Sequence, residues 1–248
     1  MVIVIATLRF RRKAAHVMTT AKASPSRLVR LASATVLASL AVTASVGTAA
    51  AAPAYPIPTV TGSGLSGSSL QDMLLTDREA SRALGVSLDE IATGSQLDST
   101  RVSPARCAGA YTPGAAYDYA DANPQDLAVK VVSDRDGTSV TEIVAELPTK
   151  KDALNHMAAT ADGWSDCQGQ TVTASGKPWI LGAPMVNDAR TMVTLSQTFA
   201  GRGRGTCERA IATYRNIVID VMTCSSAASG QGAAITQAIA DKANSQPV

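Results

Sequence analysis

Hydrophobic and polar residues alternate with two different periods along this chain, and the changes of period predict its helices and strands. Between residues 74 and 84 the apolar positions follow a helical spacing. Thr76 and Glu79 have the spacing of a capping box, and Gly85 is suited to end a helix in a left-handed conformation. We therefore expect the folded part to begin near Leu70 and to include a short amphipathic helix that is capped at Thr76 and ends at Gly85.

The period changes to two after residue 125. The stretches "DLAVKVVS" and "SVTEIVAEL" alternate as strands do, and "DRDG" between them supplies the Asp136-Gly137 dipeptide that favours tight turns. A β-hairpin is predicted here. Thr149 and Asp152 then predict the start of a second helix, for which Gly163 is the expected end.

Beyond Cys167 the pattern is that of strands almost to the end of the chain. The segments with this pattern are "QTVTAS", "KPWILGAPMV", "RTMVTLSQTF", "TCERAIATY" and "NIVIDVMTC". The final stretch, "QGAAITQAIADKA", has apolar residues on one helical face. This order of elements predicts an α+β domain with an antiparallel sheet.

The N-terminal 52 residues have the composition of a secretory signal peptide. They hold seven cations and no acid, then an apolar run from Leu31 to Val46 and the small residues of "GTAAAAP". Cleavage is expected within Ala49 to Ala52, and Met18 is an alternative start. A membrane anchor is the competing interpretation, but the run is short and the region contains no cysteine that a lipobox would need.

Residues 53–69 are rich in Pro, Gly and Ser and predict a flexible linker, which leaves residues 70–246 as the domain. After signal cleavage the chain retains 15 basic and 20 acidic residues, which gives a net charge of about −5. This charge argues against a nucleic-acid partner, and we expect no transmembrane segment in the secreted, extracytoplasmic product.

The four cysteines are expected to form disulfides, because an exported protein meets no reducing system. "CERAIATYRNIVIDVMTC" has two arms of similar length around Tyr214 to Asn216, so a hairpin there would place Cys207 opposite Cys224. Cys107 then pairs with Cys167 by elimination. Zinc is the alternative use, but there is no Cys-x2-Cys motif and no second histidine near His156, so we expect no metal.

Reactive chemistry is sparse. His156 is the one histidine outside the leader, and nucleophile, Walker A and zinc-protease motifs are missing from the mature sequence, so neither an enzyme nor a cofactor is expected. Aromatic side chains are the best candidates for ligand contact, although tryptophans, Trp164 above all, could equally fill the core. These aromatic candidates are Tyr111, Tyr117, Tyr119, Trp164, Trp179 and Tyr214.

Four segments together resemble one known family. They are "GWSDC", "KPWILGAP", "CERAIATYRNIVIDVMTCS" and "AAITQAIADKA", and the resemblance, over about residues 70–244, is to the extracellular sensor domain of mycobacterial PknH-type serine/threonine kinases. It implies a twisted antiparallel sheet flanked by helices, the disulfide pairs Cys107–Cys167 and Cys207–Cys224, and a cleft for an unidentified ligand. Unlike those kinases, this protein is expected to have neither a kinase domain nor a membrane helix after the signal peptide.

The expected function is therefore that of an exported, non-enzymatic binding domain for a small molecule or a component of the cell envelope. Two alternatives remain at this point. One is a protein-interaction or envelope-structural module, which a flat apolar patch would favour. The other is an unrecognised hydrolase, which acids or a serine converging on His156 would favour.

Overall fold

The computed structural model describes residues 68–245. The expected signal peptide and nearly all of the expected linker, residues 1–67, lie outside the described residues, as do residues 246–248. Among residues 68–245 no helix is both long and apolar enough to cross a membrane.

Within residues 68–245, nine strands form a single antiparallel sheet in the order β1-β3-β4-β9-β8-β7-β6-β5-β2. Most neighbours in the sheet are also neighbours in sequence, as hairpin connections require. The strands are β1 (Asp89–Gly94), β2 (Val102–Ser103), β3 (Asp126–Ser133), β4 (Ser139–Glu146), β5 (Thr171–Ala174), β6 (Lys177–Val186), β7 (Met192–Phe199), β8 (Thr206–Tyr214) and β9 (Ile217–Ser225).

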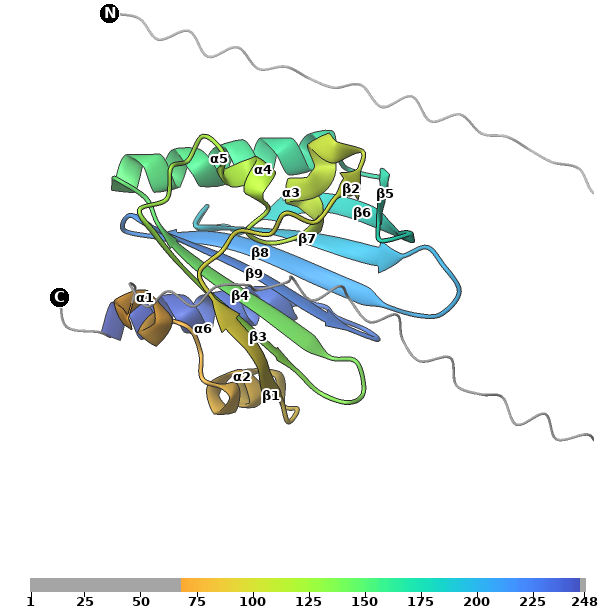
Figure 1. Ribbon diagram of the computed structural model, residues 1–248, viewed down its shortest axis with the longest axis horizontal. Coiled ribbons are helices and arrows are strands. Elements are labelled where there is room, and N and C mark those ends of the chain that lie inside the picture. The colour runs from red at the N-terminus through yellow and green to blue at the C-terminus, as the bar shows by residue number, and fades with distance from the viewer. Residues whose placement is uncertain (1–67, 246–248) are drawn as a thin grey trace, which may run out of the picture. The chain divides into compact units, whose positions relative to one another are not determined.

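Helices cover both faces of this sheet (Figure 1). One face carries the long α5, together with α3, α4 and a short 3-10 helix, η1; the opposite face carries α6 with α1 and α2. Their bounds are α1 (Ser68–Met73), α2 (Asp77–Leu84), η1 (Ala105–Cys107), α3 (Ala108–Tyr111), α4 (Ala116–Tyr119), α5 (Lys150–Asp166) and α6 (Gln231–Ser245). The prediction of an α+β fold with an antiparallel sheet flanked by helices is confirmed.

The helix starts follow from their caps. Thr76 and Glu79 form the complete capping box of α2, and Gly85 ends that helix in the left-handed region with φ 71°. Thr149 caps α5 by accepting a hydrogen bond from the backbone N–H of Asp152.

The predicted end of α5 at Gly163 is wrong, because the helix continues to Asp166. Burial of Trp164 and the disulfide at Cys167 outweigh the helix-breaking preference of one glycine, which is only about 1 kcal/mol.

Both predicted hairpins are present. β3 pairs with β4 around the loop 134–138, where the Asp134 carboxylate accepts hydrogen bonds from the N–H groups of Asp136 and Thr138. In the second hairpin Cys207 lies directly opposite Cys224. The disulfides are Cys107–Cys167 and Cys207–Cys224, so the predicted pairing is confirmed.

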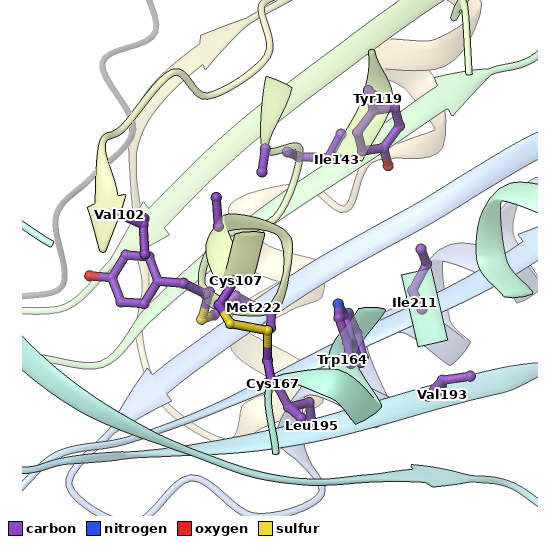
Figure 2. Packing of buried hydrophobic residues seen from close by; sticks show 14 of the residues in the cluster. Val102, Cys107, Tyr119, Ile143, Trp164, Cys167, Val193, Leu195, Ile211 and Met222 are labelled. Atoms are coloured by element: carbon purple, nitrogen blue, oxygen red, sulfur yellow. A yellow bond between two sulfur atoms is a disulfide. The ribbon is translucent and has the colours of Figure 1, made fainter. Parts of the chain in front are cut away.

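A separate hydrophobic core lies on each face of the sheet. The core beneath α5 contains both disulfides, Trp164 and Trp179 (Figure 2 shows part of this cluster). The core beneath α6 is aliphatic and includes Leu70, Ile219 and Ile235. Two-sided burial explains why consecutive residues are buried along most of β8 and β9, since a strand covered on both faces cannot alternate with solvent.

Candidate ligand site

A fully buried ion pair lies between α5 and the centre of the sheet. Arg209 of β8 donates to Asp220 of β9 through Nε, at 2.9 Å from Oδ1, and through Nη2, at 2.7 Å from Oδ2. Register explains the contact: Asp220 lies opposite Ile211, so Arg209 is its diagonal neighbour on the same face. Asp220 Oδ2 also accepts from the Gly114 N–H at 2.8 Å and the Tyr119 hydroxyl at 3.4 Å.

Trp164 covers the guanidinium from the α5 side. The Arg209 Cζ lies 4.9 Å from the Trp164 ring centroid, and the indole N–H donates to the Gly109 carbonyl at 2.9 Å. Burial alone would lower the pKa of Arg209, but the charge and hydrogen bonds of Asp220 outweigh it and hold that pKa above its ordinary value. Arg209 is therefore a permanent cation, and its Nη1 is buried without a hydrogen-bond partner among the described residues.

Asp118 of α4 is a second carboxylate near this pair. Its side chain occupies the space where a Cβ on Gly109 would lie, so the glycine is needed for this close approach. Burial raises the pKa of Asp118 to about 6, with Arg209 lowering it and Asp220 raising it. No described residue forms an ion pair or hydrogen bond with the Asp118 carboxylate.

His156 of α5 lies beside Asp118 and is only 8% exposed. Its ring centroid is 4.3 Å from that of Tyr119, and its Nε2 is buried without a hydrogen-bond partner in the described part of the chain. Burial lowers the pKa of His156, so the imidazole is neutral at pH 7.

Two hollows open on this cluster. The Trp164 hollow, of about 280 Å³, is lined chiefly by α3, α4 and α5 and includes Arg106, Tyr117, Thr160 and Trp164. The Asp121 hollow, of about 440 Å³, lies toward the start of α5 and includes Asp121, Asn123, Asp152 and Asn155. Asp118, His156 and Ala159 line both hollows, so the unpaired carboxylate and the buried imidazole are common to the two.

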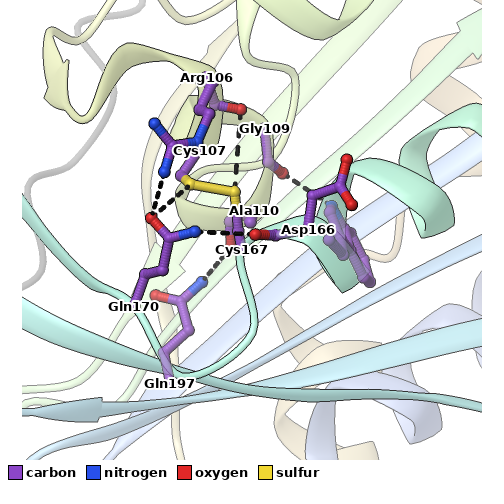
Figure 3. The surroundings of a disulfide bond; sticks show 9 residues. Arg106, Cys107, Gly109, Ala110, Asp166, Cys167, Gln170 and Gln197 are labelled. Atoms are coloured by element: carbon purple, nitrogen blue, oxygen red, sulfur yellow. Dashed lines mark hydrogen bonds between the residues drawn. A yellow bond between two sulfur atoms is a disulfide. The ribbon is translucent and has the colours of Figure 1, made fainter.

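The linings of both hollows are acidic. Asp118 and Asp166 line the Trp164 hollow, and Asp118, Asp121 and Asp152 line the other. Arg106 is the cation among these linings, and its Nη2 donates to Gln170 Oε1 at 2.9 Å (Figure 3). The acids are not arranged for a metal ion, because within residues 68–245 no three His, Cys, Asp or Glu side chains converge to hold one.

The disulfide Cys107–Cys167 fixes one wall of the Trp164 hollow. It joins η1 to the end of α5, and the Gln170 amide extends the connection by donating to the Asp166 carbonyl at 2.8 Å (Figure 3). The Gln197 amide donates from β7 to the Ala110 carbonyl at 2.9 Å, which holds α3 on the sheet (Figure 3). The short helices near the hollow are thus tied to both α5 and the sheet.

A third hollow lies on the opposite face and is mainly apolar. This Met185 hollow, of about 550 Å³, is lined by β6 to β8 and the start of α6, including Met185, Met192, Glu208 and Ala233. Met185 is 67% exposed. Within the described residues, the Met185 hollow is the region that most resembles an apolar contact surface.

Comparison with known proteins assigns the chain to a family. The model of the PknH-like extracellular domain matches residues 65–242, which is well over half of the chain. The chain belongs to the PknH-like extracellular domain family. The extracellular nature of that domain places this chain outside the cytoplasm, as the sequence predicted.

Individual relatives agree with this assignment. The serine/threonine-protein kinases PknH of Mycobacterium bovis and Mycobacterium tuberculosis are each 30% identical to the chain over 111 residues, which is 43% of this chain. The match spans only 18% and 17% of those kinases. The crystal structure of the extracellular domain of PknH from Mycobacterium tuberculosis superposes with a TM-score of 0.67 at 24% identity, covering 75% of this chain and all of the other, which shows a shared fold.

In this family member the aromatic candidates do not gather at one place. Trp164 lines its hollow, and Tyr117, 62% exposed, lies at the rim of the same hollow. Tyr111, Tyr119 and Trp179 are buried in the core, the last against Phe199. Tyr214 is half-buried on the α6 side, where its hydroxyl donates to Asn244.

Sequence reasoning missed the charged residues of the site. Asp118 lies in a segment whose Tyr, Pro and Gly content gave no prediction. Arg209 and Asp220 carried a usable signal, because both are charged residues in the middle of apolar strand patterns. Arg209 is separated from Cys207, and Asp220 from Cys224, by an even number of positions along its strand. Because Cys207 lies opposite Cys224 in the hairpin, both charged residues lie on the same face of the sheet as the two cysteines.

Proposed function

We propose that this domain binds a small molecule or a component of the cell envelope, without catalysis, at the Trp164 and Asp121 hollows. The observation that carries the proposal is the group of polar side chains on which both hollows open. His156 Nε2 is buried without a hydrogen-bond partner among residues 68–245, and the half-buried Asp118 carboxylate beside it forms no ion pair or hydrogen bond with those residues. Buried polar groups in folded proteins are almost always paired, so unpaired ones beside a hollow indicate a place for a ligand.

The chemistry of the linings supports binding rather than hydrolysis. The side-chain hydroxyls lining the two hollows belong to Thr160 and Tyr117, and Cys167 is held in a disulfide. His156 makes no hydrogen bond to a hydroxyl within the described residues, whereas an activated nucleophile needs such a base. In a hydrolase assay the native chain and the His156→Ala variant are therefore expected to show the same rate.

Native mass spectrometry of the purified full chain tests the proposal. Ala159 is exposed and lines both hollows, so Ala159→Trp should block them without entering the core. Ala158→Trp makes the same change at the adjacent exposed position, which lines neither hollow. A copurifying compound should be retained by the native chain and the Ala158 variant but lost from the Ala159 variant; retention by both variants, or no bound compound in any form, would contradict the proposal.

A protein-interaction module is the second candidate, and the Met185 hollow favours it. Met185 and Val186 expose large apolar side chains at the end of β6, where a partner surface would bury them. Met185→Asp should abolish such a contact and leave the compound carried by the other two hollows in place. The two functions are thus separated by variants on opposite faces of the sheet.

A further inference from the structure

We propose that the Trp164 and Asp121 hollows take a small organic cation, whose ammonium group pairs with Asp118 where the two hollows meet. The inference rests on the proposed binding function and names the class of its ligand. It is carried by three features of the described residues: an uncompensated charge, hydrogen-bond acceptors beside it, and an exposed aromatic ring at the rim.

The cluster holds two carboxylates and one guanidinium, of which Asp220 and Arg209 are fully buried and Asp118 is half-buried. Arg209 directs two of its nitrogens, Nε and Nη2, to Asp220 at 2.9 and 2.7 Å, and it makes no hydrogen bond to Asp118 within residues 68–245. Asp118 is therefore left with the longer-range attraction of a cation that is already paired. With Asp118 ionised the three groups carry a net charge of −1. A single positive charge placed against Asp118 makes the cluster neutral, and in a partly desolvated site that interaction is stronger than in water.

The hydrogen-bonding character of the site also matches an ammonium group. An ionised carboxylate only accepts hydrogen bonds, and a neutral imidazole always keeps one nitrogen that can accept. Asp118 and His156 line both hollows, so the acceptors belong to both. A primary ammonium group carries three N–H donors and no acceptor, and is therefore the complementary partner.

Tyr117 supplies the third feature. Its ring lines the Trp164 hollow and is exposed, unlike the buried Trp164, so its face is available to an organic cation. Quaternary and primary ammonium groups are attracted to the faces of aromatic rings. Hollows of about 280 and 440 Å³ suit an aliphatic amine rather than a large lipid or polymer.

The competing ligand classes fit less well. A divalent metal ion would need several protein ligands, and no three candidate ligands converge within the described residues. An anion would meet four aspartates in the two linings and only Arg106, whose Nη2 already donates to Gln170. A neutral polyol would leave the charge of Asp118 uncompensated.

Isothermal titration of the full chain with n-butylammonium, and with 1-butanol as its neutral counterpart, tests the proposal at pH 7.5. The ammonium should bind at least about tenfold more tightly than the alcohol, the size expected for a charge-assisted hydrogen bond. Asp118→Asn should remove that difference. Asp136→Asn makes the same change in the exposed β3–β4 loop and should leave it intact.

A second variant covers the case in which Asp118→Asn disturbs the fold. Ala159→Lys places a cation at the exposed position shared by the hollows and should repel butylammonium, whereas Ala158→Lys should not. Equal affinity for the amine and the alcohol, or full binding by both Asp118→Asn and Ala159→Lys, would overturn the cation proposal. Those outcomes would leave the binding function standing, because that function is judged separately by the copurifying compound and the Ala159→Trp variant.

Discussion

Replacing Glu142 by Gln is expected to stabilise the domain at neutral and alkaline pH but not in acid. Glu142 lies on β4 with its side chain fully buried on the α6 face. Its Oε2 accepts the Leu75 N–H at 2.8 Å, and its Oε1 has no partner among the described residues. Burial raises the pKa of Glu142 to about 8 despite that hydrogen bond and the nearby Lys130 and Lys242.

The sign of the effect follows from proton binding. Below pH 4.5, the ordinary pKa, Glu142 is protonated in both the folded and the unfolded chain and costs no ionisation energy. Between pH 4.5 and about 8 the folded state retains a proton that the unfolded chain has released, so the free energy of unfolding falls by up to about 1.4 kcal/mol per pH unit. The full loss, reached above pH 8, is on the order of 5 kcal/mol.

Gln keeps an acceptor for the Leu75 N–H and carries no charge. Because the protonated carboxyl also buries a donor, Gln and Glu should be about equally stable near pH 4.5. At pH 9 the Glu142→Gln variant should exceed the native chain by several kcal/mol. The difference in unfolding free energy between the variant and the native chain is compared at each pH. Other groups such as Asp118, whose raised pKa acts in the same direction, are present in both chains, so the pH dependence of this difference reports on Glu142.

Urea unfolding at pH 5 and pH 9 measures this difference, with the fluorescence of the buried Trp164 and Trp179 as the signal. Glu146→Gln is a matched control at the half-buried end of the same strand, where the side chain accepts from Asn216. If Glu142→Gln shifts stability by the same amount at both pH values, the carboxylate is not desolvated as described and the reasoning fails.

Three further substitutions test the packing in thermal and urea unfolding. Asp220→Asn should cost about 3 to 5 kcal/mol by leaving Arg209 buried without its counter-charge, and a loss below 1 kcal/mol would show that water reaches the pair. Gly163→Ala should raise stability by about 1 kcal/mol, because nothing lies within 4 Å of the new Cβ on this exposed helical turn; a decrease would refute that placement. Gly232→Ala should instead destabilise, since its Cβ would lie 2.7 Å from the Glu208 carbonyl oxygen, and an unchanged Tm would mean that α6 moves away freely.

The elements that the sequence predicts well are those fixed by local signals. The helix caps at Thr76 and Thr149 depend on residues only a few positions apart, and so do the turns of the two hairpins. The local sequence is therefore enough to predict them. β1 and β2 were not predicted, because β1 is largely exposed and β2 has only two residues. Their places at the two edges of the sheet depend on pairing with distant strands, which no local pattern encodes.

The candidate site was predictable only in part, for a related reason. Trp164 was predicted as an aromatic candidate that could equally fill the core, and the structure shows both features: the side chain is buried in the core and lines a hollow. The position of the Asp118 carboxylate depends on Gly109, whose missing side chain leaves room for it. Gly109 is nine residues away, in a stretch for which the sequence gave no prediction. His156 was weighed as a catalytic base and set aside, but its burial depends on Tyr119 packing against it from another helix.

The peptide bond between Glu208 and Arg209 in β8 joins two different environments. Glu208 lines the Met185 hollow and accepts the Ala233 N–H of α6, while Arg209, its neighbour in sequence, pairs with Asp220 beneath α5. Adjacent strand residues point to opposite faces, so only the thickness of one backbone separates the two surfaces. The Glu208–Arg209 backbone unit therefore takes part in both faces at once, in the contact with the first turn of α6 on one side and in the ion pair beneath α5 on the other.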